Sequence, residues 1–143
     1  MLQVHGTSIV WKGAALLLRG PSGSGKSDLA LRLVEAGGAL IADDRTILEI
    51  QAGRLIASAP PPISGLLEIR GIGIVKVASA RPAVLELVVD LVRPEAVVRM
   101  PEKACCVYLG ITLPQVFIAP FEGSAVVKLR YAIEAARNDG RAA

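Results

Sequence analysis

The run GPSGSGKS, Gly20 to Ser27, constrains the fold of this chain more than any other feature. It matches the pattern G-x-x-x-x-G-K-[ST] at every fixed position, and in that pattern a glycine-rich loop joins a buried strand to a helix. The apolar run Ala14 to Arg19 comes directly before the loop and is typical of a buried strand. Residues 28–36 follow with apolar side chains at helical spacing, and Gly37 and Gly38 end that helix. The sequence therefore predicts a strand–loop–helix unit.

The residues of this loop suit a phosphate ligand. Glycine adopts positive φ angles that other residues resist, so the loop glycines allow consecutive N–H groups to converge on an anion. The positive end of the following helix points at the same place. A plain glycine turn before a helix would not require Lys-Ser at its end. We expect ATP to bind along the whole loop, with Lys26 at the β- and γ-phosphates and the Ser27 hydroxyl on Mg²⁺; the loop residues are Gly20, Pro21, Ser22, Gly23, Ser24, Gly25, Lys26 and Ser27.

Length and composition limit the class of protein. The chain has 143 residues, enough for one domain spanning 1–143. The net charge of +3 suits an acidic ligand such as ATP, and the chain has no arginine-rich run or aromatic ladder that would indicate nucleic acid. No apolar run reaches the roughly 18 residues of a membrane span, and the first residues lack the features of a signal peptide. We therefore expect a cytoplasmic protein.

The rest of the chain predicts many strands and one further helix. The composition is 52% hydrophobic but only 3% aromatic, so the core must consist of Ala, Val, Leu and Ile. The adjacent Cys105 and Cys106 are expected to be ordinary strand residues, because adjacent cysteines rarely form a disulfide. Ser124 is a candidate N-cap for a helix to about Arg137. The expected strands are residues 2–10, 14–19, 40–42, 46–51, 54–59, 66–77, 85–92, 106–109 and 115–119, with a proline-containing loop at 59–65 and an irregular segment at 94–103.

Asp43 and Asp44 are candidates for the second half of a catalytic site. They end a short apolar strand soon after the loop helix, where phosphate-loop enzymes place a carboxylate near Mg²⁺ or the attacking group. Adjacent residues at a strand end point to opposite faces, so we expect the two carboxylates to have different roles. The alternative is that both are turn residues before the hairpin at 46–59.

Three more residues have open roles on the sequence alone. Glu68 and Arg70 are two residues apart, so they should share one strand face. Glu68 could hold Mg²⁺ and Arg70 could bind phosphate, or the two could form a solvated ion pair. His5 is the only histidine, and a single histidine near an N-terminus is usually an ordinary surface or core residue.

Taken together, the features of this chain resemble one family. His-Gly near the start, the GPSGSGKS loop, the ADD at 42–44 and the LEIRGIGI at 67–74 occur in that order. This order resembles the catalytic domain of HPr kinase/phosphorylase, the bacterial serine kinase that acts on the phosphocarrier protein HPr. The resemblance covers about residues 4–136. It implies an α/β fold with a phosphate-loop, phosphoenolpyruvate-carboxykinase-like core of mixed strands and few helices.

The resemblance also implies roles for individual residues. His5, Lys26, Asp43 and Asp44 would be catalytic-site residues, with Asp44 preferred as the acid–base group, and Glu68 would be a Mg²⁺ ligand beside Ser27. Arg99, in VRMPE, aligns loosely with a family arginine that contacts the protein substrate or its phosphate. The partner would be HPr, in the control of carbohydrate metabolism through the phosphotransferase system. Family oligomers are commonly hexamers, and the mean hydropathy of +0.52 fits a homo-oligomer with an apolar interface.

The sequence differs from the family pattern in two respects that bear on the expected function. The family carries a further N-terminal domain, whereas this chain begins almost at the catalytic core. The stretch at 120–125, PFEGSA, lacks the Gly-Arg-Asn that the family ties to dephosphorylation, so the kinase reaction is favoured over the reverse reaction. Two other functions stay open: a small-molecule kinase on the same scaffold, and a non-catalytic nucleotide-sensing module.

Overall fold

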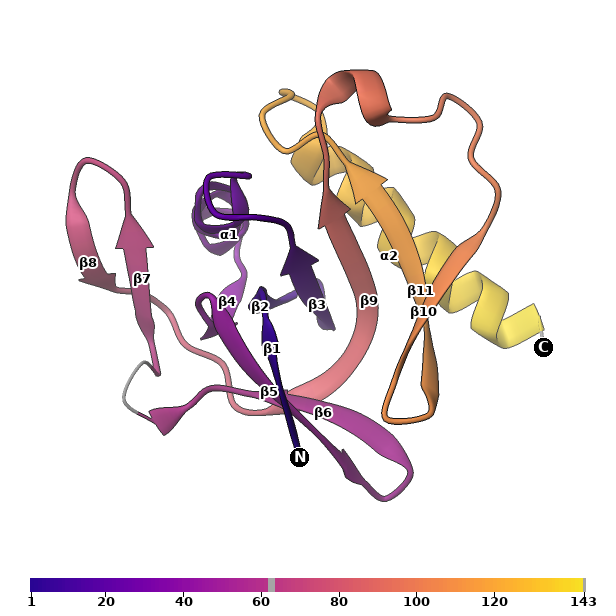
Figure 1. Cartoon of the computed structure of the whole chain (residues 1–143), viewed down its shortest axis with the longest axis horizontal. Coiled ribbons are helices and arrows are strands. Elements are labelled where there is room, and N and C mark those ends of the chain that lie inside the picture. The colour runs from indigo at the N-terminus through magenta and orange to yellow at the C-terminus, as the bar shows by residue number, and fades with distance from the viewer. Residues whose placement is uncertain (62–63, 143) are drawn as a thin grey trace.

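The computed structural model describes residues 1–61 and 64–142, and the side chains within them up to residue 138 (Figure 1). The strands are β1 (Leu2–His5), β2 (Thr7–Trp11), β3 (Ala14–Arg19), β4 (Ala39–Ala42), β5 (Arg45–Gln51), β6 (Arg54–Ser58), β7 (Leu66–Ile69), β8 (Gly73–Lys76), β9 (Ala83–Leu91), β10 (Ala104–Tyr108) and β11 (Ile111–Ile118). The helices are α1 (Lys26–Glu35), the short 3₁₀ helix η2 (Pro94–Ala96) and α2 (Ala125–Ala142). The expected mixed α/β fold with few helices is confirmed.

Strand β3, which leads into the phosphate loop, lies in the middle of a curled sheet. It pairs with β9 in parallel and with β2 in antiparallel fashion, and β4 pairs with the far edge of β2. Strand β9 is long and curved (Figure 1): its start pairs with β6, and its end pairs in parallel with β11. The strands β3, β4, β9 and β11 therefore run in the same direction, and their carboxyl ends lie toward one edge of the molecule.

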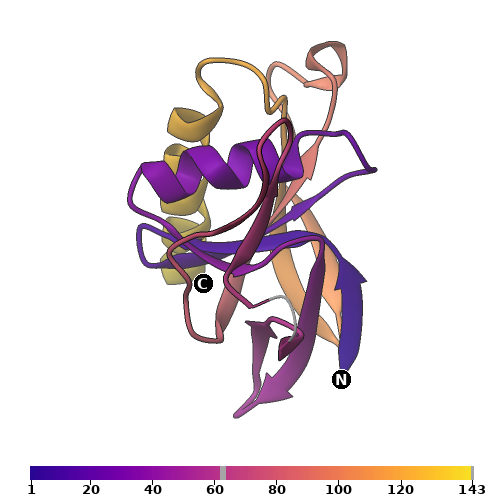
Figure 2. The ribbon, with the colours of Figure 1, turned by 90° about the vertical axis from the view of Figure 1, so that its left-hand side faces the viewer.

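Both faces of β3 are buried, which explains its uninterrupted apolar sequence. Leu16 and Leu18 pack into a cluster with residues of α1 and α2, whereas Leu17 packs into a second cluster with β5 and β6. Figure 2 shows the two helices on one side of the sheet. The core consists almost entirely of Leu, Ile, Val and Ala, as the composition predicts.

Two expected elements differ from the structure. Residues 2–10 are two strands: β1 pairs with β5, whereas β2 pairs with β3 and β4. The chain changes partners at Gly6, whose N–H donates to the carbonyl of Asp44 and where a side chain would collide with Leu17. Residues 66–77 form the hairpin β7–β8, so Arg70 lies in its turn and does not share a strand face with Glu68.

The other expected elements are confirmed with shifted ends. Strands β5 and β6 form the expected hairpin, with both turn residues, Ala52 and Gly53, at positive φ. Helix α2 starts directly after Ser124 and continues to Ala142, past the expected end. Cys105 and Cys106 are free thiols in β10. The expected loop 59–65 includes residues 62 and 63, which lie outside the described residues. Over the described part of the chain, no helix combines the length and hydropathy needed to cross a membrane.

Candidate active site

The phosphate loop leaves the carboxyl end of β3 and enters α1 through glycines in unusual conformations. Gly23 has φ of 81° and Gly25 has φ of 103°, values that favour glycine. Gly25 is the residue before the first turn of α1, and no side chain caps that turn. The N–H groups of the turn are therefore available to an anion, with the helix dipole behind them.

Lys26 lies buried across its own loop. Its ammonium group donates to the carbonyl oxygens of Gly20, at 2.6 Å, and Pro21, at 3.0 Å. These bonds hold the positive charge beside the loop N–H groups. The arrangement concentrates positive potential in the space that an anionic ligand of the loop would occupy.

Asp43 connects the phosphate loop with two other elements. Its Oδ1 accepts hydrogen bonds from the Ser27 hydroxyl, at 2.9 Å, and from the Thr7 hydroxyl, at 3.0 Å. Its Oδ2 accepts a bond of 3.1 Å from the backbone N–H of Glu68, at the hairpin β7–β8. An ionised carboxylate is an acceptor on both oxygens, so these three donors fix its orientation.

Whereas the Asp43 carboxylate bonds to Ser27, the Asp44 carboxylate pairs with His5. Its Oδ1 lies 2.6 Å from His5 Nε2, and the two side chains are 58% and 52% exposed. Asp44 has φ of 66°, an uncommon value outside glycine, and its N–H donates to the Thr7 hydroxyl at 3.1 Å. The two carboxylates therefore do diverge, as the strand geometry predicts: one lies beside Ser27 and the other faces solvent.

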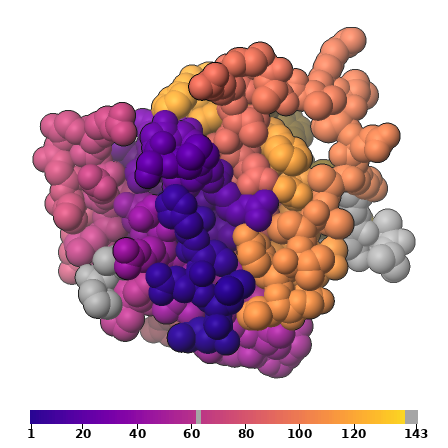
Figure 3. Space-filling view, viewed as in Figure 1, coloured from indigo at the N-terminus to yellow at the C-terminus, as the bar shows by residue number. Residues whose placement is uncertain are grey.

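The surface of the molecule leaves this pair accessible. Figure 3 shows the N-terminal part of the chain (indigo) at the surface, between the hairpin β7–β8 and the strands β10 and β11. Because more than half of the Asp44 side chain is exposed, a hydroxyl group from another molecule can reach its carboxylate from solvent.

Thr7 is a site residue that the sequence analysis did not identify. Its side chain is fully buried, and its hydroxyl contacts both aspartates, donating to Asp43 and accepting from the Asp44 N–H. The polar pair Thr7-Ser8 in a buried strand was the available signal. Ser8 has a separate role, because its hydroxyl bonds to the buried Thr46.

Two candidate residues lie farther from this cluster. Glu68 is exposed, and only its backbone N–H bonds to Asp43. Arg99 is exposed in the segment between η2 and β10, and no described hydrogen bond joins it to the other site residues. No group of three or more metal-binding His, Cys, Asp or Glu side chains occurs among the described residues. The adjacent oxygens of Ser27 and Asp43 nonetheless suit Mg²⁺, which binds one or two protein oxygens together with phosphates and water.

A part-buried ion pair anchors the strand end that precedes the loop. Arg19 binds Asp90 of β9 through two nitrogens, at 2.7 and 2.8 Å, and also donates to the Tyr108 hydroxyl. Its hydrogen bond with Asp90 raises the pKa of Arg19, against the opposite effect of burial. Burial would raise the pKa of Asp90, but hydrogen bonds from Arg19 and Gln115 hold it below its ordinary value of 3.8.

Comparison with known proteins shows which family this chain matches. The family model described as HPr Serine kinase C-terminal domain matches residues 1–139. The chain is 43% identical over 77 residues to an HPr kinase/phosphorylase of Clostridium tetani, covering 54% of this chain and 25% of that protein. It is 47% identical over 75 residues to an HPr kinase/phosphorylase of Brevibacillus brevis, covering 52% of this chain and 24% of that protein. The match therefore spans about a quarter of the length of these relatives.

The fold of this chain also matches that of a solved structure over almost its whole length. The Hpr(Ser) kinase/phosphatase of Coxiella burnetii superposes with a TM-score of 0.83 at 25% sequence identity. The superposition covers 99% of this chain and 98% of the other. The expected phosphate-loop, phosphoenolpyruvate-carboxykinase-like fold is thereby confirmed.

Proposed function

Because this chain belongs to the HPr serine kinase C-terminal domain family, we propose that it is an ATP- and Mg²⁺-dependent protein kinase that phosphorylates a seryl residue of HPr. The observation that carries the proposal is the pair Asp44–His5, 2.6 Å apart and open to solvent next to a phosphate loop. A loop alone would support nucleotide binding, whereas an accessible carboxylate beside it supports activation of a hydroxyl group.

In this proposal Asp44 is the general base. Its carboxylate accepts the proton of the seryl hydroxyl as the oxygen bonds to the γ-phosphorus, and the bond from phosphorus to the leaving ADP oxygen breaks. His5 acts as a positioning residue: in the tautomer that carries its proton on Nε2, the Nε2–H group donates to Asp44 Oδ1, and this bond restricts the rotation of the carboxylate. Lys26 and the loop N–H groups stabilise the charge that develops on the transferred group.

Asp43 has the second role in this proposal. Its bond to Ser27 holds two oxygen ligands side by side at the start of α1, where Mg²⁺ would bind together with the phosphates. Mg²⁺ held there would neutralise part of the phosphate charge during transfer. Glu68 is a further proposed ligand, because its backbone already contacts Asp43. Arg99 is proposed to contact the acceptor protein from its exposed segment.

Transfer of labelled γ-phosphate from ATP to purified HPr tests the proposal. Wild-type protein should produce phosphoserine, and Asp44→Asn should lower the rate about 10²- to 10⁴-fold, the usual contribution of a general base. The control is Glu134→Gln, because Glu134 is an exposed residue of α2 that is distant in sequence from the phosphate loop. This variant should keep the wild-type rate.

Two results would contradict the proposal: no transfer to HPr by the wild type, or undiminished transfer by Asp44→Asn. Nucleotide binding without transfer would favour a nucleotide-sensing module, and consumption of ATP with a metabolite would favour a small-molecule kinase. The reverse reaction is expected to be weak, because the connection between β11 and α2 lacks Gly-Arg-Asn. The homo-oligomer, including the hexamer, stays a prediction that size measurement in solution would test.

A further inference from the structure

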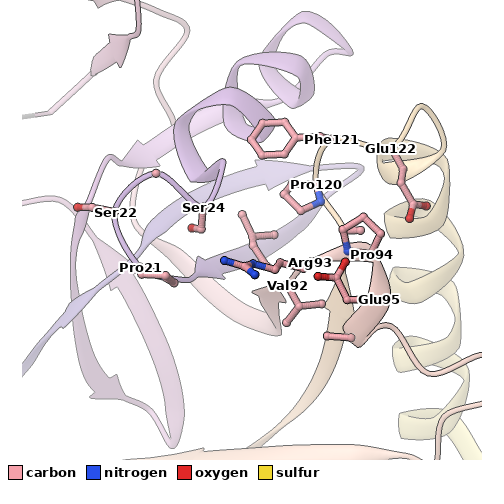
Figure 4. A pocket seen from close by; sticks show the side chains of 14 residues that line it. Pro21, Ser22, Ser24, Val92, Arg93, Pro94, Glu95, Pro120, Phe121 and Glu122 are labelled. Carbon is pink, nitrogen blue, oxygen red and sulfur yellow. The ribbon is translucent and has the colours of Figure 1, made fainter.

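A cavity of about 750 Å³ lies beside the phosphate loop, on the side away from Asp43 and Asp44. The loop residues Pro21–Ser24 form one wall, the end of β9 with η2 forms the second, and the connection from β11 to α2 forms the third (Figure 4). Residues of the catalytic cluster do not line it. The cavity is therefore separate from the site of phosphoryl transfer, although the two share the loop.

The strand order explains why the aspartates and the cavity lie on opposite sides of the loop. β4, whose carboxyl end carries Asp43, lies on one side of β3, and β9 and β11, whose carboxyl ends line the cavity, lie on the other. In open α/β sheets, ligands bind outside the carboxyl ends of the strands. A triphosphate that crosses the loop from Ser27 and Asp43 would place its α-phosphate toward the cavity.

The groups in the cavity suit a nucleoside. Phe121 presents a ring that is 69% exposed, and Pro94 and Pro120 add apolar surface. The Ser24 hydroxyl oxygen is buried and has no hydrogen-bond partner among the described residues. Figure 4 shows Arg93 extending toward the loop, and within the described part of the chain its guanidinium has no ion pair or side-chain hydrogen bond. An aromatic face, an unpaired hydroxyl and an unpaired cation at one place match a base, a ribose and an α-phosphate.

We propose that this cavity binds the nucleoside half of the phosphate donor, with the base stacked on Phe121 and with Ser24 and Arg93 facing the ribose and the α-phosphate. The inference rests on the proposed use of ATP. Stacking on an aromatic side chain contributes substantially to the binding of nucleic-acid bases, and the cavity is large enough for a nucleoside, because ligand pockets commonly range from about 300 to 1,000 Å³.

Calorimetric binding of Mg·ATP and of Mg·tripolyphosphate to the full chain tests this inference, because the two ligands differ by the nucleoside. Wild-type protein should bind ATP more tightly than tripolyphosphate. Phe121→Ala should weaken ATP binding about tenfold, the lower part of the range for stacking, and should leave tripolyphosphate binding within about twofold. Phe121→Trp should restore the preference for ATP.

Phe117→Ala is the matched control, because Phe117 is an exposed phenylalanine of β11 that does not line the cavity. It should change neither affinity. Phe121 also packs over Gly25, so an equal loss of both ligands in Phe121→Ala would indicate a purely structural role and overturn the inference. Equal affinity of the wild type for both ligands, or no binding of either, would overturn it as well.

The outcomes for this inference and for the proposed function are distinguishable. Phosphorylation of HPr together with equal binding of ATP and tripolyphosphate would overturn the nucleoside site alone. A clear preference for ATP that depends on Phe121, without transfer to HPr, would overturn the kinase proposal and support the nucleoside site.

Discussion

The neighbouring residues Asp43 and Asp44 have different partners, and this difference allows their roles to be separated. Asp43 is held by Ser27, Thr7 and the Glu68 N–H, whereas Asp44 is held by His5 and faces solvent. A carboxylate with three donors is suited to fixing geometry, and an accessible one is suited to exchanging a proton with a substrate.

We expect Asp43→Asn to weaken Mg·ATP binding about tenfold or more, because the amide removes a charge next to the proposed metal position. Asp44→Asn should leave Mg·ATP binding within about twofold and act on transfer alone. Calorimetric titration of both variants with Mg·ATP measures this difference. Equal losses of affinity in the two variants would contradict separate roles for Asp43 in Mg·ATP binding and Asp44 in transfer.

Gly25 offers a second prediction for a single residue. A Cβ there would lie 2.9 Å from Phe121 Cζ and 3.0 Å from Pro120 Cγ, at φ of 103°. Gly25→Ala should therefore destabilise the protein by about 1 kcal/mol or more through backbone strain and also reduce tripolyphosphate binding, because the methyl group and the strained backbone distort the contact between the loop and residues 120–121.

Gly37→Ala is the control for Gly25→Ala. Gly37 has a similar φ of 100° but no heavy atom within 4 Å of the added Cβ. It should show the strain in urea unfolding and bind tripolyphosphate like the wild type. Unchanged binding in Gly25→Ala would contradict the steric argument.

At the scale of elements, the ion pair Arg19–Asp90 joins the ends of β3 and β9 directly before the phosphate loop. The pKa of Asp90 is lowered in the folded state, so the unfolded chain binds more protons between the folded value and the ordinary value of 3.8. The stabilisation is therefore fully present above pH 4, approximately, and is lost as the pH falls through the folded pKa.

Asp90→Asn should thus have a lower free energy of unfolding than the wild type at pH 7. The difference in this free energy between the variant and the wild type should become smaller below about pH 4. Urea unfolding at several pH values measures this difference. Gln115→Ala removes one hydrogen bond to the same carboxylate and should give a smaller effect of the same sign. A difference that grows as the pH falls would contradict the assignment of the lowered pKa to Asp90.

At the scale of the whole molecule, stability depends on packing of both helices against one face of the sheet. Leu129 of α2 is fully buried in the cluster that includes Leu29 and Leu33 of α1. Leu129→Ala should cost about 2–5 kcal/mol in the free energy of unfolding. Val127→Ala, on the exposed side of the same helix, should change it by less than about 0.5 kcal/mol. Similar losses in both variants, measured in urea, would mean that α2 is not packed as described.

The phosphate-loop unit could be predicted from the sequence because its signals are local. The strand, the glycines, Lys26-Ser27 and the apolar face of α1 lie within one short segment, and each restricts its own backbone. The divergence of Asp43 and Asp44 was predictable for the same reason, since adjacent residues at a strand end point to opposite faces. The fold class and the family followed from these motifs and their order.

The contacts that complete the site depended on residues far apart in the chain. His5 meets Asp44 across 39 residues and Thr7 meets Asp43 across 36, because Gly6 lets the chain pass from β1 to β2 between them. Phe121 and Arg93 reach the loop only because β9 and β11 run parallel to β3. The sequence by itself determined the strand–loop–helix unit of the phosphate loop, since this unit is a property of one segment. Only the tertiary structure decided which side of the loop holds the carboxylates and which side holds the cavity, since that depends on strand order.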